Sequence, residues 1–284
     1  MYNISIITPT KNSEKYILDN LQSVHLNQNL HNINIEHIII DGNSTDKTMD
    51  IVEQFKDEYN TNIKLIESKD DKGMYDAINK GICNITNDIW SVLNSDDMYS
   101  SNTLSLVLNE FKQNSLLDVV YGNVDMTDAN DKFIHTLYLP KFNLEYLVLK
   151  GYCLTILQPA LFLRKSVIDK VGYFNLDYKY ASDYDYCIRL GMKCSLKHIS
   201  KSLTKYRMHS DSITWGDTER RKIQTWETKD ISNKWIIKMN LQRRSISFND
   251  DVIMYLNQIH YKNFNYILTR VRQMIMNRFF GVNK

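Results

Sequence analysis

Two adjacent carboxylates, Asp96 and Asp97, close a short apolar run that begins at Ile89. An apolar run that stops at a polar cluster is typical of a buried strand whose end reaches the protein surface. Neighbouring carboxylates repel each other unless a proton or a cation lies between them, and Mg²⁺ is commonly held by one or two carboxylates together with substrate phosphates. These residues favour a site for a metal ion and a diphosphate group. The alternative is a turn or a helix cap, where Asp is frequent for structural reasons alone.

Strands and helices are predicted to alternate around this stretch, within the first 100 residues. Short apolar runs, most of them rich in β-branched residues, predict strands at residues 4–9, 35–40, 63–66 and 89–93. Helical periodicity follows the first three strands, with Ser13 and either Thr45 or Asp46 as expected N-terminal caps. Such alternation predicts an α/β fold with a parallel sheet wrapped by helices.

Each of these strands is followed by a polar loop. The loops lie at residues 8–11, 41–46, 68–73 and 94–97. Right-handed crossovers bring such loops to one edge of a sheet, where open α/β sheets bind their ligands. The nine glycines of the chain are widely separated, and neither GxGxxG nor a P-loop is present. The charge of a bound phosphate group must therefore be met by a metal ion or by side chains.

The second half of the chain continues with strands and helices and then becomes helical. Helices are expected at 102–111, 166–171 and 183–190, and strands at 118–122, 158–164 and 203–209. Residues 127–152 are less periodic and are expected to form loops, edge strands and a short helix. From about residue 217 the pattern predicts helices at 223–240 and 251–280, joined by a turn at 243–247.

The charge is unevenly distributed along the 284 residues. The net charge is +2, but residues 219–284 carry 13 Lys and Arg against 5 Asp and Glu, so the first 218 residues are acidic. An acidic body suits a metal-dependent site, and a basic tail suits a surface that meets an anion. The last helix is basic and amphipathic, so it is expected either to lie on an anionic membrane or to pack on the body with its basic side in water. No continuous basic face or base-reading motif favours nucleic acid as a partner.

The cysteines and the N-terminus bear on location. The four cysteines are scattered, without a CxxC pair or the spacing of a zinc site, and unpaired thiols favour a reducing compartment. The N-terminal apolar run is too short for a signal peptide and lacks a basic leader, and no window reaches the roughly 18 apolar residues of a membrane span. We therefore expect a cytoplasmic protein, at most peripheral on the inner face of the plasma membrane.

Five motifs occur in order along the chain. They are Thr8-Pro9-Thr10-Lys11-Asn12, Asp41–Asp46, Asp71–Gly81, Leu93–Asp97 and Asp183-Tyr184-Asp185. Together they resemble the inverting glycosyltransferases of family 2, especially the bacterial enzymes of surface-polysaccharide assembly. The resemblance covers residues 3–215 and implies the GT-A fold, a Rossmann-like, mixed and mostly parallel sheet flanked by helices. It implies a nucleotide-sugar-binding half at 1–100 and an acceptor-binding half at 101–215, while residues 216–284 form a basic helical extension outside it.

The resemblance also implies a reaction. A sugar would move from a nucleotide-diphospho sugar, with a UDP-sugar expected, to a glycan or a polyprenyl-diphosphate-linked glycan. The setting would be capsule, O-antigen of lipopolysaccharide, or exopolysaccharide assembly. Mn²⁺ or Mg²⁺ would neutralise the leaving diphosphate. The rival hypotheses are a non-catalytic nucleotide-sugar-binding module, which has no use for a base, and a sugar nucleotidyltransferase, which usually carries a glycine-rich loop near its first strand.

Most of the donor contacts implied by the resemblance lie in the first half. The expected donor-binding residues are Thr8, Pro9, Asp41, Asp71, Asn94, Ser95, Asp96, Asp97 and Arg207. Asp41 would bond the base, Asp71 would lie beside the nucleoside, and Arg207 would meet phosphate charge. Asp96 and His209 are the expected metal ligands, with Asp97 as a second carboxylate ligand or a sugar contact. Asn94 stands at the first position of the family's DxD motif, where an amide brings no charge, so weaker metal binding is expected.

Asp183 is implied as the catalytic base, with Asp185 as its rival. The acceptor hydroxyl must lose its proton as it attacks the anomeric carbon, and a carboxylate within hydrogen-bond reach can accept that proton. A single displacement of this kind inverts the anomeric configuration. The family's usual Glu-Asp pair is Ser182-Asp183 here, so the match is partial. The structural alternative is that both acids only favour the N-terminus of a helix.

Overall fold

The computed structural model describes residues 2–28, 32–150, 156–210, 212 and 218–241. The helix predicted at 251–280 and the turn predicted at 243–247 lie outside these residues. So does the basic amphipathic segment for which a membrane contact is one of the two expectations.

The first half forms a parallel sheet, as the alternation predicts. Its strands are β1 (Tyr2–Thr10), β2 (Ile33–Asp41), β3 (Ile63–Glu67) and β4 (Ile89–Val92), in the spatial order β3-β2-β1-β4. The helices between them are α1 (Ile17–His25), α2 (Thr48–Tyr59) and α3 (Met74–Ile82). Helices cover both faces of a parallel sheet, so its strands are apolar on both sides. Three successive residues of β2, Ile38, Ile39 and Ile40, are accordingly all fully buried.

The second half adds antiparallel and parallel strands to the same sheet. They are β5 (Met98–Tyr99), β6 (Val119–Thr127), β7 (Phe133–Leu137), β8 (Leu161–Arg164) and β9 (Leu196–Arg207). The order continues from β4 as β8-β6-β9-β5, and β7 pairs with β6. β8 runs antiparallel to both β4 and β6, whereas β6 and β9 are parallel. The expected mixed sheet is therefore confirmed.

Three predicted strands differ clearly from the structure, and one of them, expected at 118–122, continues to Thr127 as β6. The strand expected at 158–164 begins only at Leu161, because Gln158–Ala160 form a 3₁₀ turn. Pro159 has no backbone N–H to donate to a sheet ladder, which explains the delayed start. The strand expected at 203–209 begins at Leu196, and its first half is half-buried or exposed and rich in Lys and Ser. That half therefore lacks the apolar signal of a strand.

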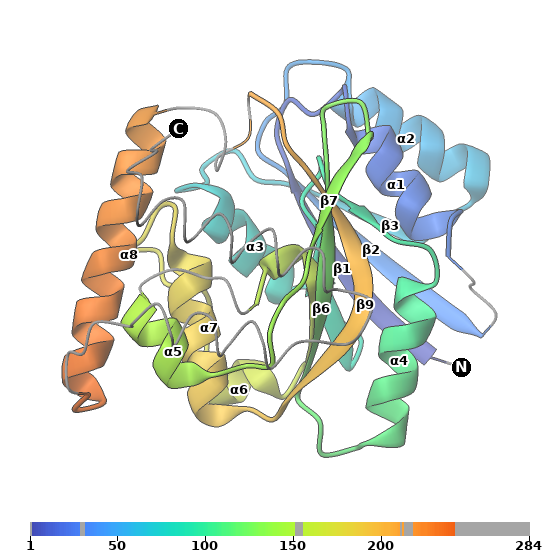
Figure 1. Ribbon diagram of the computed structural model, residues 1–284. Helices are drawn as coiled ribbons and strands as arrows, with labels where there is room; N and C mark the ends of the chain where they lie inside the picture. The colour runs from blue at the N-terminus through green and yellow to red at the C-terminus, as the bar shows by residue number, and fades with distance from the viewer. Residues whose placement is uncertain (1, 29–31, 151–155, 211, 213–217, 242–284) are drawn as a thin grey trace.

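The sheet separates two layers of helices (Figure 1). One layer consists of α1, α2 and α4 (Thr103–Gln113). The other consists of α3, α5 (Leu144–Lys150), α6 (Val167–Val171), α7 (Ser182–Lys193) and α8 (Thr218–Lys238). α8 packs into the core of this second layer through Ile231 and Trp235, which are 1% and 8% exposed. The described part of the expected C-terminal extension therefore packs against the helices of the glycosyltransferase-like region as part of the same core. The domain boundary expected after residue 215 stays a prediction.

The starts of two helices test the predicted caps. α1 begins at Ile17, later than a Ser13 cap predicts, because the Ser13 carbonyl accepts the N–H groups of Tyr16 and Ile17 at 2.9 Å each and closes a turn first. The N-cap residue of α2 is Lys47, without a side-chain cap bond, so neither Thr45 nor Asp46 is the cap; Asp46 lies one residue earlier, where its Oδ1 accepts the N–H of Thr48 at 3.0 Å. Among the described residues, no helix combines the length and the apolar character needed to cross a membrane.

Candidate active site

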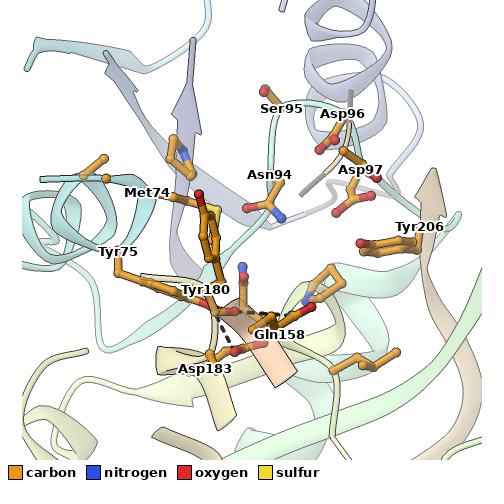
Figure 2. A pocket seen from close by; sticks show the side chains of 18 of the residues that line it. Met74, Tyr75, Asn94, Ser95, Asp96, Asp97, Gln158, Tyr180, Asp183 and Tyr206 are labelled. Carbon is orange, nitrogen blue, oxygen red and sulfur yellow. Dashed lines mark hydrogen bonds between the residues drawn. The ribbon is translucent and has the colours of Figure 1, made fainter. Parts of the chain in front are cut away.

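A cavity of about 1130 Å³ lies over the carboxyl ends of the parallel strands, and all four predicted loops reach it (Figure 2). From these loops it is lined by residues that include Pro9, Gly42, Asp71 and the Asn94–Asp97 turn. Residues of the second half complete the wall, among them Gln158, Tyr180, Asp183, Tyr206 and His209. Helix α8 adds Gln224, Thr225, Thr228, Lys229, Ser232 and Asn233. The predicted convergence of polar loops at one sheet edge is therefore confirmed.

The Asn94–Asp97 turn is held in place by side chains of the first helical segment. Asn20 of α1 donates from Nδ2 to the carbonyl oxygens of the first and last residues of the turn, at 2.9 and 3.0 Å. The Ser13 and Ser95 hydroxyls share a hydrogen bond of 2.8 Å. Asn20 is fully buried on the apolar side of α1. Asn20 is not among the predicted site residues, although an amide within an apolar helical stripe is a signal that could have identified it.

Asp96 and His209, the two expected metal ligands, lie side by side. Asp96 Oδ2 and His209 Nε2 are 2.9 Å apart. His209 follows the end of β9 and packs against the ring of Tyr16, with ring centroids 4.7 Å apart. The His209 side chain is 7% exposed and that of Asp96 is 27% exposed, so the pair faces the cavity from a sheltered position.

Several buried polar atoms of this cavity have no hydrogen-bond partner within the described protein. They include Thr10 Oγ1, Asn94 Oδ1, Asp97 Oδ2 and His209 Nδ1. Buried polar groups are almost always paired, so a cluster of unpaired ones indicates that their partners come from the content of the cavity, which is a bound ligand or water. Burial, and secondly the charge of Asp96, raises the pKa of Asp97 well above its usual value. A bound cation or hydrogen-bond donor would offset this desolvation of the carboxylate.

The donor atoms beside this turn suit a hard divalent cation. Mg²⁺ and similar ions bind oxygen ligands at about 2.1 Å in near-octahedral geometry, which places neighbouring ligands about 3 Å apart. Asp96 Oδ2 and His209 Nε2 are joined by a hydrogen bond of 2.9 Å, which bonds to a cation would replace if both atoms held it. In the part of the chain that the structure describes, no three His, Cys, Asp or Glu side chains converge as a metal site. Asp97 stays a prediction, either as a second carboxylate ligand or as a sugar contact, and water and a diphosphate group would complete the coordination.

Asp183 stands in the first turn of α7 and faces the cavity across from the Asn94–Asp97 turn (Figure 2). Its Oδ1 accepts the hydroxyl of Tyr75 at 3.0 Å and the N–H of Tyr184 at 2.9 Å. Burial raises the pKa of Asp183 above the usual carboxyl value. A carboxylate with a raised pKa is a stronger base, so this side chain is suited to accept a proton from a hydroxyl in the cavity.

Asp185, the rival base, is already bonded on both of its oxygens. Oδ1 accepts the indole N–H of Trp235 at 2.9 Å, and Oδ2 accepts the Nε–H of Arg189 at 2.8 Å. Asp185 is 8% exposed and is not among the residues that line the cavity. The geometry therefore favours Asp183 as the base. It also adds Tyr75, a member of the third motif whose side chain the sequence analysis does not single out.

Arg207 lies behind the cavity wall and does not line it. Its guanidinium donates to Asp19 at 2.7 Å and to the Asp96 carbonyl at 3.1 Å, and it stacks 4.7 Å from the centroid of the Tyr16 ring. Its backbone N–H donates to Asp97 Oδ1 at 3.1 Å, and its side chain is 3% exposed. We therefore correct the expected phosphate contact. A buried guanidinium with these partners supports the turn that carries Asp96 and Asp97.

Thr8 and Asp41 also support the wall. Thr8 Oγ1 bonds His37 Nε2 at 2.9 Å, and the Asp41 carboxylate accepts a backbone N–H at 3.1 Å and a hydroxyl at 2.6 Å from the loop that follows it. Both side chains are buried at the ends of β1 and β2. Neither of these two expected donor contacts lines the cavity; Pro9 and Thr10 line it at the end of β1, and Gly42 lines it after β2.

Asp71 lines the cavity beside the end of β3. Its Oδ1 accepts the Ser68 hydroxyl at 2.5 Å and pairs with Lys80 Nζ, also at 2.5 Å. Ser68 is a wall residue as well. The hydrogen bond and the ion pair fix the carboxylate at the position that the sequence analysis expects for a nucleoside contact.

The half-buried His25 and the fully buried His37, which lies behind Thr8, predict a loss of stability in acid. Burial lowers the pKa of His25 to about 4 and that of His37 well below its usual 6.5, and the two rings bond at 3.1 Å. Both rings stay neutral in the folded chain while the unfolded chain takes up protons below pH 6.5, so the folded state loses stability as the pH falls.

We expect the free energy of unfolding to decrease from pH 6.5 towards pH 4, by up to about 1.4 kcal/mol per pH unit for each ring. Urea unfolding at several pH values measures this slope. The His25→Gln variant should show a shallower slope, and identical slopes in the variant and the wild type would contradict the prediction.

The residues of the cavity can be compared with those that this chain shares with known proteins. Residues 5–172 match the family described as glycosyl transferase family 2. The matched region contains the four strand-end loops and Tyr75, whereas α7 with Asp183 and the whole of α8 follow it.

A PGL/p-HBAD biosynthesis glycosyltransferase of Mycobacterium bovis is 33% identical over 156 residues, which cover 54% of this chain and 57% of the relative. The chain thus spans little more than half the length of the curated relatives it matches first. Among solved structures, S. aureus TarS 1–349 in complex with UDP-GlcNAc has a TM-score of 0.65 at 19% identity, covering 90% of this chain and 71% of that one. The mannosyltransferase PcManGT of Pyrobaculum calidifontis, in complex with GDP-Man and Mn²⁺, has a TM-score of 0.58 at 15% identity over 80% of this chain and 64% of its own. The likeness confirms the expected GT-A fold.

Proposed function

The chain belongs to glycosyltransferase family 2, and on that premise we propose that it moves a sugar from a nucleotide-diphospho sugar to an acceptor hydroxyl with inversion. The observation that carries the proposal is the placement of Asp183 across one cavity from Asp96 and His209. In a single displacement the nucleophile loses a proton while negative charge grows on the leaving group. A base on one wall and a cation-binding pair on the other meet both needs.

We propose a UDP-sugar as the donor. Two structural neighbours were solved with nucleotide sugars, one with UDP-GlcNAc and the other with GDP-Man and Mn²⁺. In this chain Pro9, Gly42 and Asp71 line the cavity beside β1, β2 and β3. The nucleoside would lie there, beside the fixed carboxylate of Asp71, and the diphosphate would reach the Asn94–Asp97 turn.

Asp183 acts as the base in the proposed reaction. Its carboxylate accepts the acceptor's hydroxyl proton while the acceptor oxygen bonds to the anomeric carbon and the bond from that carbon to the diphosphate breaks. The Tyr75 hydroxyl holds the carboxylate at 3.0 Å and so fixes the direction of its oxygens. Attack on the face opposite the leaving group inverts the configuration.

Asp96 and His209 would hold the divalent cation, Mn²⁺ or Mg²⁺, which when bound neutralises charge on the leaving diphosphate. Asn94 and Asp97 each keep an unpaired buried oxygen in the same turn. These oxygens are acceptors for hydroxyl groups of the ribose or of the donor sugar. Ser95 would contact the donor beside them.

We propose that the acceptor enters beside α5 and α8. Hydroxyl and amide groups line the cavity there, on Thr225, Thr228, Ser232 and Asn233, and two cations are added by Lys150 and Lys229. Hydroxyl and amide groups suit sugar hydroxyls, and ammonium groups suit phosphate oxygens. A glycan or a polyprenyl-diphosphate-linked glycan has this chemistry, and we place the reaction in capsule, O-antigen or exopolysaccharide assembly. The expected cytoplasmic location and the contact with an anionic membrane stay predictions.

Each rival hypothesis disagrees with one part of the cavity. A nucleotide-sugar-binding module does not need a buried base held by Tyr75. A sugar nucleotidyltransferase is expected to cradle phosphates in a glycine-rich loop after its first strand, and Thr8–Asn12 contains no glycine.

Donor binding and turnover by the whole purified chain test the proposal. UDP-, GDP- and dTDP-sugars are titrated by calorimetry with Mn²⁺, with Mg²⁺ and with EDTA, and the slow release of nucleoside diphosphate to water is followed beside them. One nucleotide class should bind in a metal-dependent way and be turned over. If no nucleotide sugar binds under any metal condition, the proposed function fails.

A further inference from the structure

Helix α8 follows the residues that match the family, yet it is bonded to the segment that presents Asp183. Glu227 of α8 is 4% exposed. Its Oε1 accepts the N–H of Lys179 at 2.7 Å, and its Oε2 accepts the N–H groups of Tyr180 at 2.8 Å and Ala181 at 3.0 Å. Three successive backbone amides, just before α7, thus converge on one buried carboxylate.

This carboxylate bonds the backbone that leads into α7, and of its three partners only the N–H of Ala181, the N-cap residue, belongs to the helix terminus. The residue before α7 is Ala181, and no side-chain capping bond is present at the start of this helix. The first N–H groups of a helix lack partners inside it, and the positive end of the helix dipole attracts an anion. A buried carboxylate is stable only where charge-assisted bonds compensate its lost hydration, and the three amides provide such bonds. Glu227 therefore orders the backbone in front of Asp183.

Other side chains of α8 bond the same segment. The Tyr178 hydroxyl lies 3.1 Å from Asp230 Oδ2 and 3.0 Å from Lys234 Nζ. Trp235 donates to Asp185 at 2.9 Å. Residues 178–185 are thus attached to α8 on one side, while Tyr75 of α3 bonds Asp183 on the other.

We propose that Glu227 is a positioning residue of the active site, which sets Asp183 against Tyr75 by fixing the backbone of Lys179–Ala181. The inference rests on the proposed role of Asp183 as the base. Glu227 is not among the residues that line the cavity, so it acts through Asp183 and not by touching substrate.

The charge of Glu227 also reaches Asp183. Burial is the main reason that the pKa of Asp183 is raised, and the negative charge of Glu227 adds to it. The other charged or titratable groups on the elements around Asp183 include Tyr75, Asp185 with its partner Arg189, and the cavity-lining Lys150 and Lys229. Removing the Glu227 charge leaves all of these in place. It should therefore move the acidic limb of the pH–rate profile to lower pH, which loss of packing alone would not do.

The experiment compares Glu227→Gln with Glu219→Gln in the whole chain. Glu219 lies on the same helix, is exposed and pairs with Lys222, so its variant controls for loss of a carboxylate from α8. We expect Glu227→Gln to lower kcat for nucleoside diphosphate release about tenfold to a hundredfold, because small displacements of a reacting group have effects of this size. The donor Kd should stay within about twofold, since donor contacts lie on the other wall. Glu219→Gln should match the wild type.

A double variant separates positioning from general loss of structure. If Glu227 acts through Asp183, adding Glu227→Gln to Asp183→Asn should lower kcat no further than Asp183→Asn alone. Multiplying losses, or an unchanged kcat in Glu227→Gln, would overturn the inference. Should Glu227→Gln fail to fold, Glu227→Asp replaces it. That variant keeps the charge but is one methylene shorter, so kcat should fall while the acidic limb stays in place.

Amide hydrogen exchange keeps this inference distinct from the proposed function. Residues 179–181 should exchange faster in Glu227→Gln than in Glu219→Gln, because Gln keeps only one acceptor oxygen and replaces the other with an –NH₂ group that cannot accept their N–H bonds. If the wild type turns over no donor, the proposed function fails. Faster exchange at 179–181 in Glu227→Gln would still show that Glu227 bonds these amides. If the wild type is active and exchange at 179–181 is unchanged in Glu227→Gln, the positioning role is wrong.

Discussion

Replacing Asp183 by Asn is expected to lower turnover about 10²–10⁴-fold while the donor Kd stays within about twofold. The amide keeps the size of the side chain and can still accept the Tyr75 hydroxyl bond, now 3.0 Å long. It cannot accept the proton of the attacking hydroxyl. The loss should therefore fall on kcat, because the interaction that is removed matters in the transition state and not in donor binding.

The kcat of the wild type is also expected to depend on pH through the ionisation of Asp183. Burial raises the pKa of Asp183, so the fraction of ionised base, and with it kcat, should fall as the pH decreases through that raised value. The folded state also holds this proton more tightly than the unfolded chain, so stability decreases as the pH rises from the ordinary carboxyl range through the raised pKa. Asp183→Asn removes this decrease in stability, because the amide does not ionise. Its melting temperature at neutral pH should therefore equal or exceed that of the wild type.

Asp185→Asn is the matched control, two residues along the same helix. Asp185 bonds Trp235 and Arg189 and does not line the cavity. Its amide variant loses an ion pair of low exposure, so thermal unfolding should show a lower melting temperature. Turnover of the folded variant should stay within about tenfold of the wild type, since no reacting group is removed. The opposite pattern, with Asp185→Asn inactive and Asp183→Asn active, would assign the base to Asp185.

The first half of the fold was predictable because its signals are local. Each strand from β1 to β4 is a short apolar run, and a polar loop follows each run. The cavity wall built by Pro9, Asp71 and Asn94–Asp97 could therefore be predicted from the sequence, although the order of the strands in the sheet could not. The first half of β9 was not predicted as a strand, because its side chains are half-buried or exposed and show no apolar pattern.

The site residues show where a sequence pattern stops being informative. Asp183 and Asp185 have the same chemistry and lie in the same helical turn, and contacts with distant residues separate them: Asp185 bonds Trp235, 50 residues later, and Asp183 bonds Tyr75, 108 residues earlier. Arg207 likewise has the chemistry of a phosphate ligand, but its partner Asp19 lies 188 residues earlier. Glu227 carried no motif at all, because its three partners are backbone amides of a distant segment.

Asp96→Ala is expected to weaken donor binding about tenfold to a hundredfold in the presence of Mn²⁺. Asp96 and His209 are the two predicted ligands of the cation, and their side chains, hydrogen-bonded at 2.9 Å, lie close enough to bind the same ion. Loss of the carboxylate removes the anionic ligand and leaves only an imidazole, so both the cation and the diphosphate that it would bridge bind less tightly. Calorimetric titration of the donor with Mn²⁺ and with EDTA measures the effect.

The comparison with EDTA decides whether the carboxylate acts through the metal. Wild-type protein in EDTA should bind donor about as weakly as Asp96→Ala in Mn²⁺, and EDTA should then weaken the variant little further, because one interaction cannot be lost twice. Asp70→Ala is the control: Asp70 is an exposed acid beside the cavity-lining Asp71, and its removal changes the net charge equally without removing a wall residue. Its donor Kd should match the wild type. If Asp96→Ala keeps full affinity, or if EDTA has no effect on the wild type, Asp96 and His209 do not hold a cation, and the charge of the diphosphate must be met by lysines of the cavity wall such as Lys11 and Lys15.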